Sequence, residues 1–274
     1  MTTKRLPDPG KSVVFREQAG AQGKGGLFGP QWAFAAFYWR SIRLVAALMF
    51  RKRETVADTA AVRRRFQELS LRYIEDLSRR GIGFFEYEGF EDVESWRGSL
   101  ICPNHPSILD AISLFAKIPK AGCVVGSNPL RNPLLSTLAR MGDFIPRNPA
   151  LRMVRECRSR LAHGENIIVF PEGTRTSDGA INPFHDGPAL AAIKAEAPVR
   201  TILIECNTLF LSQRYSFFQC APWPVIFRLS PGKVFHPACD DDPRAFTREL
   251  EDYFRASLRR DGDKIEKTRS EVGQ

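Results

Sequence analysis

The chain has 274 residues, of which 43% are hydrophobic and 11% aromatic, so it can bury a sizeable core and is not expected to be disordered. Its 40 basic and 31 acidic residues give a formal charge of +9, which favours phosphate-bearing partners but does not distinguish an anionic membrane from nucleic acid. The six cysteines form no Cys-x-x-Cys pair. This spacing indicates neither a zinc site nor a disulfide framework, and it favours a reducing, cytoplasmic compartment.

The first 80 residues are predicted to form two segments outside the main domain. Residues 1–30 are polar and rich in glycine, without the pattern of a signal peptide, and are predicted to be a flexible arm. Residues 31–80 are predicted to be a helical, membrane-associating segment. Within it, Trp32–Phe50 is apolar and aromatic but interrupted by Arg40 and Arg43, whereas a spanning helix needs about 20 largely uncharged residues.

The composition of Trp32–Phe50 favours an amphipathic helix that lies in the membrane interface. Its aromatic side chains suit the headgroup level, and Arg40 and Arg43 would face anionic lipid together with the basic residues that follow Phe50. A core helix of the main domain with solvated arginines is the alternative interpretation.

A second helix is predicted from Asp58 or Thr59 to Gly81, with apolar residues at helical spacing. Such a stripe either packs on the core or faces the membrane. It consists of Val62, Phe66, Leu69, Tyr73 and Leu77.

Short apolar runs alternate with helical patterns over residues 81–260, which predicts one α/β domain with a mixed, mostly parallel sheet flanked by helices. The predicted strands are Gly83–Tyr87, Ser99–Cys102, Gly122–Val125, Asn166–Phe170, Val199–Glu205 and Val225–Leu229. The predicted helices lie near Ile108–Ala116, Pro133–Met141, Leu151–Ala162 and Pro188–Ala195.

The last predicted helix has the clearest boundaries. Acidic residues Asp240–Asp242 precede Pro243, and Arg259 and Arg260 are expected to end the helix, an order of charges that suits the helix dipole. Residues 261–274 are predicted to be a polar, frayed tail.

A histidine and an aspartate follow the predicted strand Ser99–Cys102. His105 and Asp110 would lie about 140° apart on a regular helix. If His105 lies in the strand-to-helix turn, with Pro106 favoured at the first helical position, Asp110 in the opening turns can fold back toward the imidazole. A carboxylate that accepts from one ring nitrogen leaves the other as a base. The alternative is a solvated turn histidine and an aspartate favoured by the dipole.

A second group of polar residues, Glu172 to Thr176, follows the predicted strand Asn166–Phe170. Gly173 allows backbone N–H groups to approach an anion, Thr174 adds a hydroxyl, and Arg175 can bind phosphate oxygens through two N–H groups. This composition predicts a phosphate site. Pairing of Glu172 with Arg175, or capping of a turn, is the alternative.

Together, Asn-His-x4-Asp and Phe-Pro-Glu-Gly-Thr-Arg resemble the first and third motifs of the glycerolipid and lysophospholipid acyltransferases, which include the bacterial 1-acyl-glycerol-3-phosphate acyltransferases. The resemblance extends from about Phe84 to Leu229. It implies that His105 is the general base and that Asp110 orients it. It also implies that an acyl-CoA or acyl-carrier protein thioester is attacked directly, with neither metal nor cofactor. The resemblance assigns acceptor binding to a set of four residues, namely Glu172, Gly173, Thr174 and Arg175.

The segment Gly142–Arg147 is similar to the second motif of that family, which makes Arg147 the candidate contact for the acceptor phosphate, with a surface arginine as the alternative. Pro146 departs from the family pattern. So does Ser127–Asn128, where many members carry a lysine, and Arg200–Thr201 interrupts the apolar stretch of the fourth motif. These departures leave the identity of the acceptor open.

Two further features were considered for the acceptor or the acyl chain. His185 follows the predicted phosphate site closely and is a candidate to line the acceptor site. The apolar stretch Cys206–Pro224 exceeds a usual connection length. It is predicted to form an acyl-chain groove, a membrane-contacting loop, or packing against the core.

By resemblance, the chain is expected to transfer a fatty acyl group to the hydroxyl of a lysophospholipid, most simply 1-acyl-glycerol-3-phosphate, in phospholipid biosynthesis. We expect it at the cytoplasmic face of the cell membrane as a peripheral or monotopic protein. Another acceptor, such as a lyso-aminolipid or a specialised lipid, is the alternative within this class. A non-catalytic basic protein is the alternative outside it, but the sequence contains no nucleic-acid reader module, so no nucleic-acid partner is expected. Nothing in the sequence indicates an oligomeric state.

Overall fold

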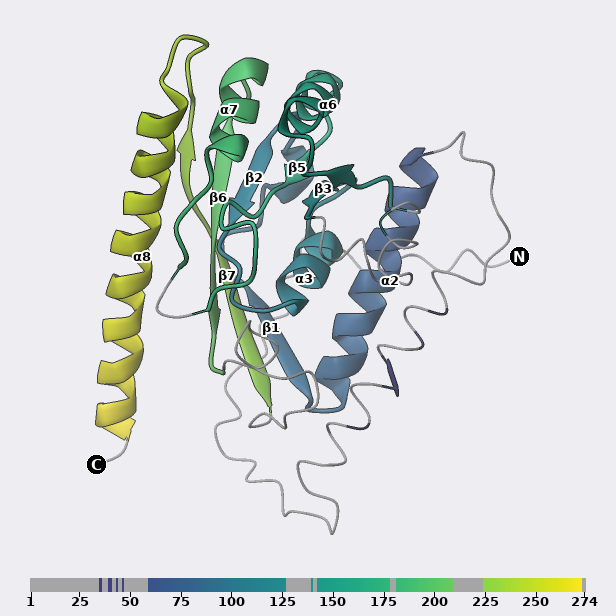
Figure 1. Ribbon diagram of the computed structural model, residues 1–274. Coiled ribbons are helices and arrows are strands. Elements are labelled where there is room, and N and C mark those ends of the chain that lie inside the picture. The colour runs from purple at the N-terminus through teal and green to yellow at the C-terminus, as the bar shows by residue number, and fades with distance from the viewer. Residues whose placement is uncertain are drawn as a thin grey trace.

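The computed structural model describes residues 59–126, 142–177, 181–208 and 224–272, together with the single positions 35, 39, 40, 43, 46 and 139. Within them, one mixed sheet lies between two layers of helices (Figure 1). Several predictions fall wholly or largely outside the described residues. They concern the arm 1–30, Trp32–Phe50, Ser127–Asn128, the helix Pro133–Met141 and the stretch Cys206–Pro224.

The sheet has seven strands in the order β1-β7-β6-β2-β5-β3-β4. Every neighbouring pair is parallel except β6 and β7, which confirms the predicted mixed, mostly parallel sheet. The strands are β1 (Gly83–Tyr87), β2 (Leu100–Pro103), β3 (Gly122–Val125), β4 (Ile145–Pro146), β5 (Ile167–Ile168), β6 (Val199–Cys206) and β7 (Val225–Phe235).

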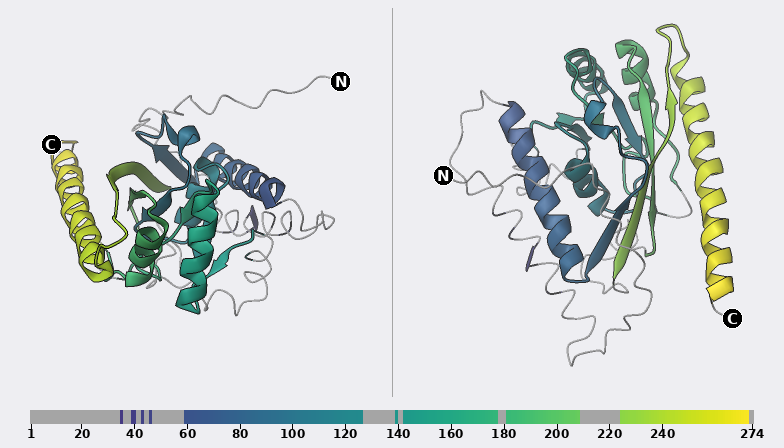
Figure 2. Two further views of the ribbon diagram at one scale, coloured as in Figure 1. Left: turned by 90° about the horizontal axis from the view of Figure 1, so that it is seen from above. Right: turned by 180° about the vertical axis from the view of Figure 1, so that it is seen from behind.

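Helices cover both faces of the sheet, and Figure 2 shows α2 and α8 on opposite sides of it. One hydrophobic core joins α2 and α3 to the sheet, and a second joins α6, α7 and α8 to the other face. The helices are α2 (Thr59–Arg79), α3 (Leu109–Lys117), α6 (Ala150–Ala162), α7 (Asp186–Ala195) and α8 (Pro243–Val272), with a short 3-10 turn at Val93–Ser95.

The central strands are apolar without interruption because both of their faces are buried. In β2, Ile101 belongs to the core beneath α2 and α3, whereas Leu100 and Cys102 belong to the core beneath α6, α7 and α8. Successive side chains of a strand point to opposite faces. Each short run therefore contributes to two cores at once, which holds the ends of the strands firmly in place.

The stripe of α2 is part of the core. Tyr73 and Leu77 are 5% and 1% exposed, and Phe66 packs against the same cluster. Of the two interpretations of this stripe, packing on the core therefore applies to these residues. Burial of side chains of this size contributes about 1.5–3 kcal/mol each.

The expectation that Arg40 faces lipid is wrong. Its side chain is only 11% exposed and forms an ion pair with Asp76 of α2. Asp76 supplies the opposite charge within the protein, so the guanidinium is neutralised against α2. The neighbouring Trp39 is 60% exposed.

The bounds of β5, β7 and α8 differ from the predicted ranges. β5 is shorter than Asn166–Phe170, because it pairs with β2 and β3 only at Ile167 and Ile168. β7 continues to Phe235 because it pairs with β6 as far as Val199. α8 continues to Val272, where a frayed tail was predicted. The one glycine of its last turns costs only about 1 kcal/mol, and the surrounding lysines, arginines and glutamates are good helix formers.

The strands β2, β3, β4, β5 and β6 run in the same direction, so their carboxyl ends meet at one edge of the sheet. This edge is where ligands bind in open α/β sheets. The three predicted motif segments follow β2, β4 and β5 and are therefore brought together there.

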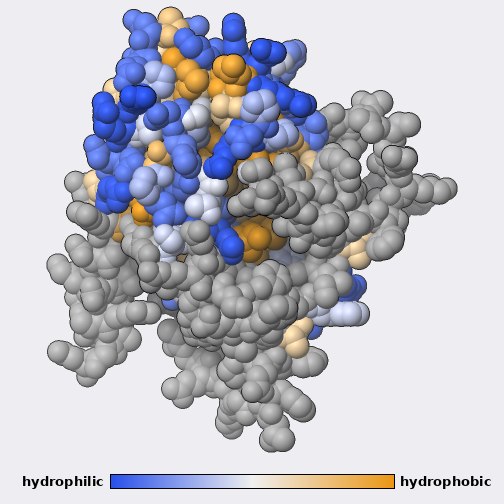
Figure 3. Space-filling model, in the orientation of Figure 1, coloured by the Kyte–Doolittle hydropathy of each residue, from blue (hydrophilic) through white to orange (hydrophobic). Residues whose placement is uncertain are grey.

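Figure 3 shows the surface of the molecule from the same side as Figure 1. The described residues on this side are largely hydrophilic, and apolar residues reach the surface between the polar ones. Among the described residues, no helix combines the length and the apolar composition that crossing a bilayer requires.

Candidate active site

His105 and Asp110 form a hydrogen-bonded pair at the carboxyl end of β2. The His105 Nδ1 atom lies 3.0 Å from the Asp110 Oδ2 atom, which also accepts from the Ser107 N–H at 2.8 Å. The helix begins at Leu109, one residue after the predicted start at Ile108, so that Pro106 lies in the turn before it and not at its first position. The Ser107 carbonyl accepts from the Asp110 N–H, so the turn at Ser107 starts the helix and directs Asp110 back toward the imidazole.

The ring of His105 is fixed in orientation. It stacks on Phe170 with ring centroids 3.8 Å apart and planes 23° apart, and its side chain is 15% exposed. An ionised Asp110 can only accept, so Nδ1 carries the proton and Nε2 keeps its lone pair. The pair therefore has the arrangement of a general base with an orienting carboxylate.

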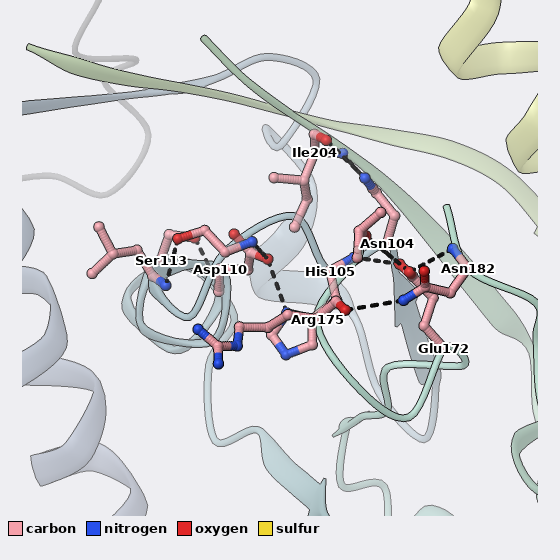
Figure 4. Close-up of polar contacts among 11 residues, drawn as sticks. Asn104, His105, Asp110, Ser113, Glu172, Arg175, Asn182 and Ile204 are labelled. Carbon is pink, nitrogen blue, oxygen red and sulfur yellow. Dashed lines mark hydrogen bonds and ion pairs between the residues drawn. The ribbon is translucent and has the colours of Figure 1, made fainter. Parts of the chain in front are cut away.

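Asp110 is fully buried, and this burial raises the pKa of its carboxyl, while the bonds from His105 and Ser107 oppose the rise. Among the described residues its second oxygen, Oδ1, has no hydrogen-bond partner. In Figure 4 the Arg175 side chain extends toward the Asp110 end of the pair. Burial lowers the pKa of Arg175, and the charge of Asp110 opposes that change. Arg175 thus supplies positive charge beside the pair.

Glu172 is turned into the protein, where its carboxylate holds the backbone of His105 (Figure 4). Its Oε1 accepts from the His105 N–H at 2.8 Å, and its Oε2 accepts from the Asn182 N–H at 2.8 Å. The Thr176 hydroxyl lies 3.0 Å from Oε1 and 2.8 Å from Oε2. The Thr176 N–H donates to the His105 carbonyl at 2.7 Å, so the backbone of the histidine is bound on both sides.

The resemblance implied acceptor binding for Glu172, but this geometry gives the carboxylate a positioning role. Its side chain is buried and both oxygens face protein donors. Burial raises its pKa, and the bonds from Asn182, Thr176 and His105 oppose the rise. For Gly173, Thr174 and Arg175, contact with the acceptor stays a prediction. Thr174 is exposed and Arg175 is half-buried.

Gly173 brings the second and third motif segments together. Its φ of +67° lies in the left-handed region that favours glycine, and its carbonyl accepts from Arg147 Nη1 at 3.2 Å. A Cβ atom at this position would collide with Arg147 Nη1 and would lie 2.9 Å from His185 Nε2. Arg147 of the second motif segment is therefore in contact with the Glu-Gly-Thr-Arg segment.

Arg200 and Thr201 lie away from this site. Arg200 lies beside Ile101 in the pairing of β2 with β6, at the end of these strands that is farther from His105. Along the strand direction, Arg200 and His105 are about 13 Å apart. The Arg200 guanidinium stacks on Trp96 and donates to Ser99, and the Thr201 hydroxyl donates to the Lys233 carbonyl. Arg200 and Thr201 therefore have structural contacts in this fold, and the identity of the acceptor stays a prediction.

Sequence reasoning missed several residues that shape the site. The Asn104 side chain donates to the Ile204 carbonyl at 2.8 Å and accepts from the Ile204 N–H at 2.7 Å, which joins the ends of β2 and β6 (Figure 4). Asn182 and Thr176 complete the surroundings of Glu172. A polar residue at the buried end of an apolar strand was the available signal for Asn104. Nothing local marked Asn182, since its partner is ten residues away.

In the described part of the chain, no group of three or more histidine, cysteine or acidic side chains is arranged to hold a metal ion. The functional groups at this edge are an imidazole, two buried carboxylates and two arginines.

A family model described as Acyltransferase matches residues 84–205. This segment of the chain is therefore similar to the acyltransferase family. All seven site residues predicted from the sequence lie within the matched segment, and so do β2, β4 and β5, which position them.

Curated relatives with acyltransferase names are similar to about half of this chain. The 1-acyl-sn-glycerol-3-phosphate acyltransferase beta of Homo sapiens is 27% identical over 143 residues, which cover 49% of this chain and 51% of the relative. A 1-acyl-sn-glycerol-3-phosphate acyltransferase of Cocos nucifera is 28% identical over 162 residues, covering 57% and 50%. The chain thus spans about half the length of the curated relatives it matches.

The fold also has a counterpart among solved structures. The 1-acyl-sn-glycerophosphate acyltransferase PlsC of Thermotoga maritima superposes with a TM-score of 0.63, and the match covers 84% of this chain and 95% of that one. At 17% sequence identity, this likeness shows that the two chains share the α/β fold.

Proposed function

We propose that this chain is an O-acyltransferase that moves a fatty acyl group from acyl-CoA or acyl-carrier protein to the hydroxyl of a lysophospholipid, with 1-acyl-glycerol-3-phosphate as the acceptor. The observation that carries the proposal is the oriented pair of His105 and Asp110, with Arg147 and Gly173 in contact at the same edge of the sheet. The names of the curated relatives support the same acceptor.

In the proposed reaction His105 acts as the general base. Its Nε2 removes the proton of the acceptor hydroxyl, and the oxygen attacks the thioester carbonyl carbon. The tetrahedral intermediate collapses as the C–S bond breaks, and the sulfur leaves with the proton from Nε2. The products are an ester and a free thiol. Asp110 holds Nδ1–H throughout and stabilises the imidazolium that forms.

The positive groups at this edge favour an acceptor that bears a phosphate. Arg147 can offer two parallel N–H donors to one phosphate, and Arg175 adds charge beside Asp110. Arg147 has no ion-pair partner among the described residues. We propose that it binds the acceptor phosphate.

The chemical step is tested with purified full-length protein, an acyl-CoA or acyl-carrier protein donor, and acceptors with and without a phosphate. We expect transfer to lysophosphatidate and a loss of at least about 10³-fold in kcat for His105→Ala. His163→Ala is the matched control because His163 is exposed and bonds to the backbone of its own helix. Turnover by His105→Ala equal to that of the control would refute the catalytic assignment.

We further propose that the protein acts at the cytoplasmic face of the cell membrane, as a peripheral or monotopic protein bound to anionic lipid. The exposed Trp39 and the charge of +9 support this attachment. Deletion of residues 1–53 is expected to move the protein into the soluble fraction. If the truncated protein stays on the membrane, the anchor lies elsewhere, with the stretch Phe210–Trp223 as the next candidate.

A further inference from the structure

We propose that His185 is a further specificity-determining residue, which binds the phosphate of the acceptor together with Arg147. This inference rests on the proposed function and names one more group at the same site. It follows from the close approach of the Arg147 and His185 side chains to Gly173.

Arg147 and His185 converge on Gly173 from two different elements. A Cβ atom added to Gly173 would have both Arg147 Nη1 and His185 Nε2 within 3 Å, so the two nitrogens are at most 6 Å apart. Hydrogen bonds of about 2.8 Å to two oxygens of one phosphate span such a distance. The lack of a side chain at Gly173 allows both groups to approach its Cα atom this closely.

The backbone around His185 is held by three bonds to other parts of the fold. The His185 N–H donates to the Pro171 carbonyl at 2.9 Å, directly before Glu172. The Phe184 N–H donates to Glu251 of α8 at 2.9 Å, and the Asn182 N–H donates to Glu172. His185 is thus positioned by the same carboxylate that positions His105. These backbone bonds set its place beside Gly173, and its side chain is exposed to solvent.

The carboxylates near His185 have other partners. Asp186 pairs with Arg244 at 3.9 Å, Glu251 pairs with Arg255 at 2.7 Å, and Glu172 is buried among donors. In the part of the chain that the structure describes, no acidic side chain forms an ion pair with His185 or Arg147. An anionic ligand therefore meets little competition at this position.

An imidazole Nε2–H donates whether the ring is neutral or charged, so His185 serves a phosphate in either form. Arg147 supplies the fixed charge and the planar pair of donors. Loss of one hydrogen bond to a charged group weakens binding by about tenfold to a hundredfold.

The test compares His185→Ala, His185→Gln and His185→Lys in the full-length protein, with lysophosphatidate and 1-acylglycerol as acceptors. We expect His185→Ala to raise the KM for lysophosphatidate by about tenfold or more with kcat within about twofold. His185→Lys should restore the KM and His185→Gln should restore it in part. With 1-acylglycerol, which has no phosphate, we expect the same KM and kcat for the wild type and for all three variants. His236→Ala is the control, because this exposed histidine follows β7 at the opposite edge of the sheet.

Binding of sn-glycerol 3-phosphate, measured by titration calorimetry, gives a readout that does not depend on turnover. We expect it to weaken in His185→Ala and in Arg147→Ala but not in His236→Ala. Unchanged binding in His185→Ala would overturn the inference, as would an unchanged KM. A wild-type protein that binds sn-glycerol 3-phosphate but transfers no acyl group would instead contradict the proposed function alone.

Discussion

Asp110 and Glu172 are both buried carboxylates near His105, but their surroundings differ. Glu172 faces protein donors with both oxygens, whereas Asp110 has one oxygen bonded to His105 and Ser107 and the other without a partner among the described residues. Burial raises the pKa of both. Glu172, with both oxygens bonded, fixes the backbone of His105. Asp110, with one oxygen left without a partner in the described part of the chain, lowers the stability of the fold but supports the chemistry of His105.

The largest effect on activity is expected from Asp110→Asn. An amide cannot hold the imidazole in the tautomer that leaves Nε2 free, so kcat should fall by about 10²- to 10⁴-fold. Because a buried charge is removed, the melting temperature should stay the same or rise. Steady-state kinetics and thermal unfolding check both parts. Activity within tenfold of the wild type would show that Asp110 does not orient His105.

Glu172→Gln should have the opposite profile, with a loss of stability and a smaller loss of activity. The new NH₂ group must face a backbone N–H, so the free energy of unfolding should fall by about 1–3 kcal/mol. The backbone of His105 is released, and kcat should fall by about tenfold to a hundredfold.

Glu249→Gln is the control for this substitution, since Glu249 is 56% exposed and pairs with Lys233 on the surface. Urea unfolding and kinetics of the two variants make the comparison. If Glu172→Gln is as stable as Glu249→Gln but cannot bind the acceptor, the positioning role is wrong and direct contact with the acceptor is favoured.

The pH dependence of stability provides a third test. A carboxyl whose pKa is raised on folding binds its proton more tightly in the folded state, so its contribution to stability is lost as the pH rises from its ordinary value toward the raised one. Asp110 has this sign, from an ordinary value of 3.8 upward. The stability of Asp110→Asn relative to the wild type should therefore increase with pH in that window. Urea unfolding at several pH values measures it, and a constant difference would contradict the burial argument.

The smallest effect is expected from Arg200→Leu. Arg200 stacks on Trp96 at the edge of the sheet opposite His105, so the KM for the acceptor should stay within about twofold while stability falls by about 0.5–2 kcal/mol. Kinetics with lysophosphatidate test this. A KM raised as far as in His185→Ala would mean that the ends of the sheet are coupled.

Much of the fold followed from local patterns. The limits of β1 and β3 agree with the predicted ranges, and α3, α6 and α7 lie within a few residues of theirs. The predictions were wrong where a boundary depends on a distant partner. β7 extends because it pairs with β6, β5 is short because it pairs with β2 and β3 at only two residues, and Arg40 pairs with Asp76.

The candidate site was predicted in its residues but not in its geometry. His105, Asp110 and Arg147 were chosen from motifs, and the fold brings them to one edge of the sheet. The inward direction of Glu172 was not predicted, because its donors come from His105, Thr176 and Asn182 in separate turns.

The sequence by itself determined the alternation of strands and helices and the residue types that carry the chemistry, since hydrophobic periodicity and side-chain chemistry are local properties. The tertiary structure decided what each side chain does. The direction of a carboxylate, the neighbours of Gly173 and the distance of Arg200 from His105 depend on which strands lie side by side. Strand pairing is set by packing across the whole core, and no short stretch of sequence contains it.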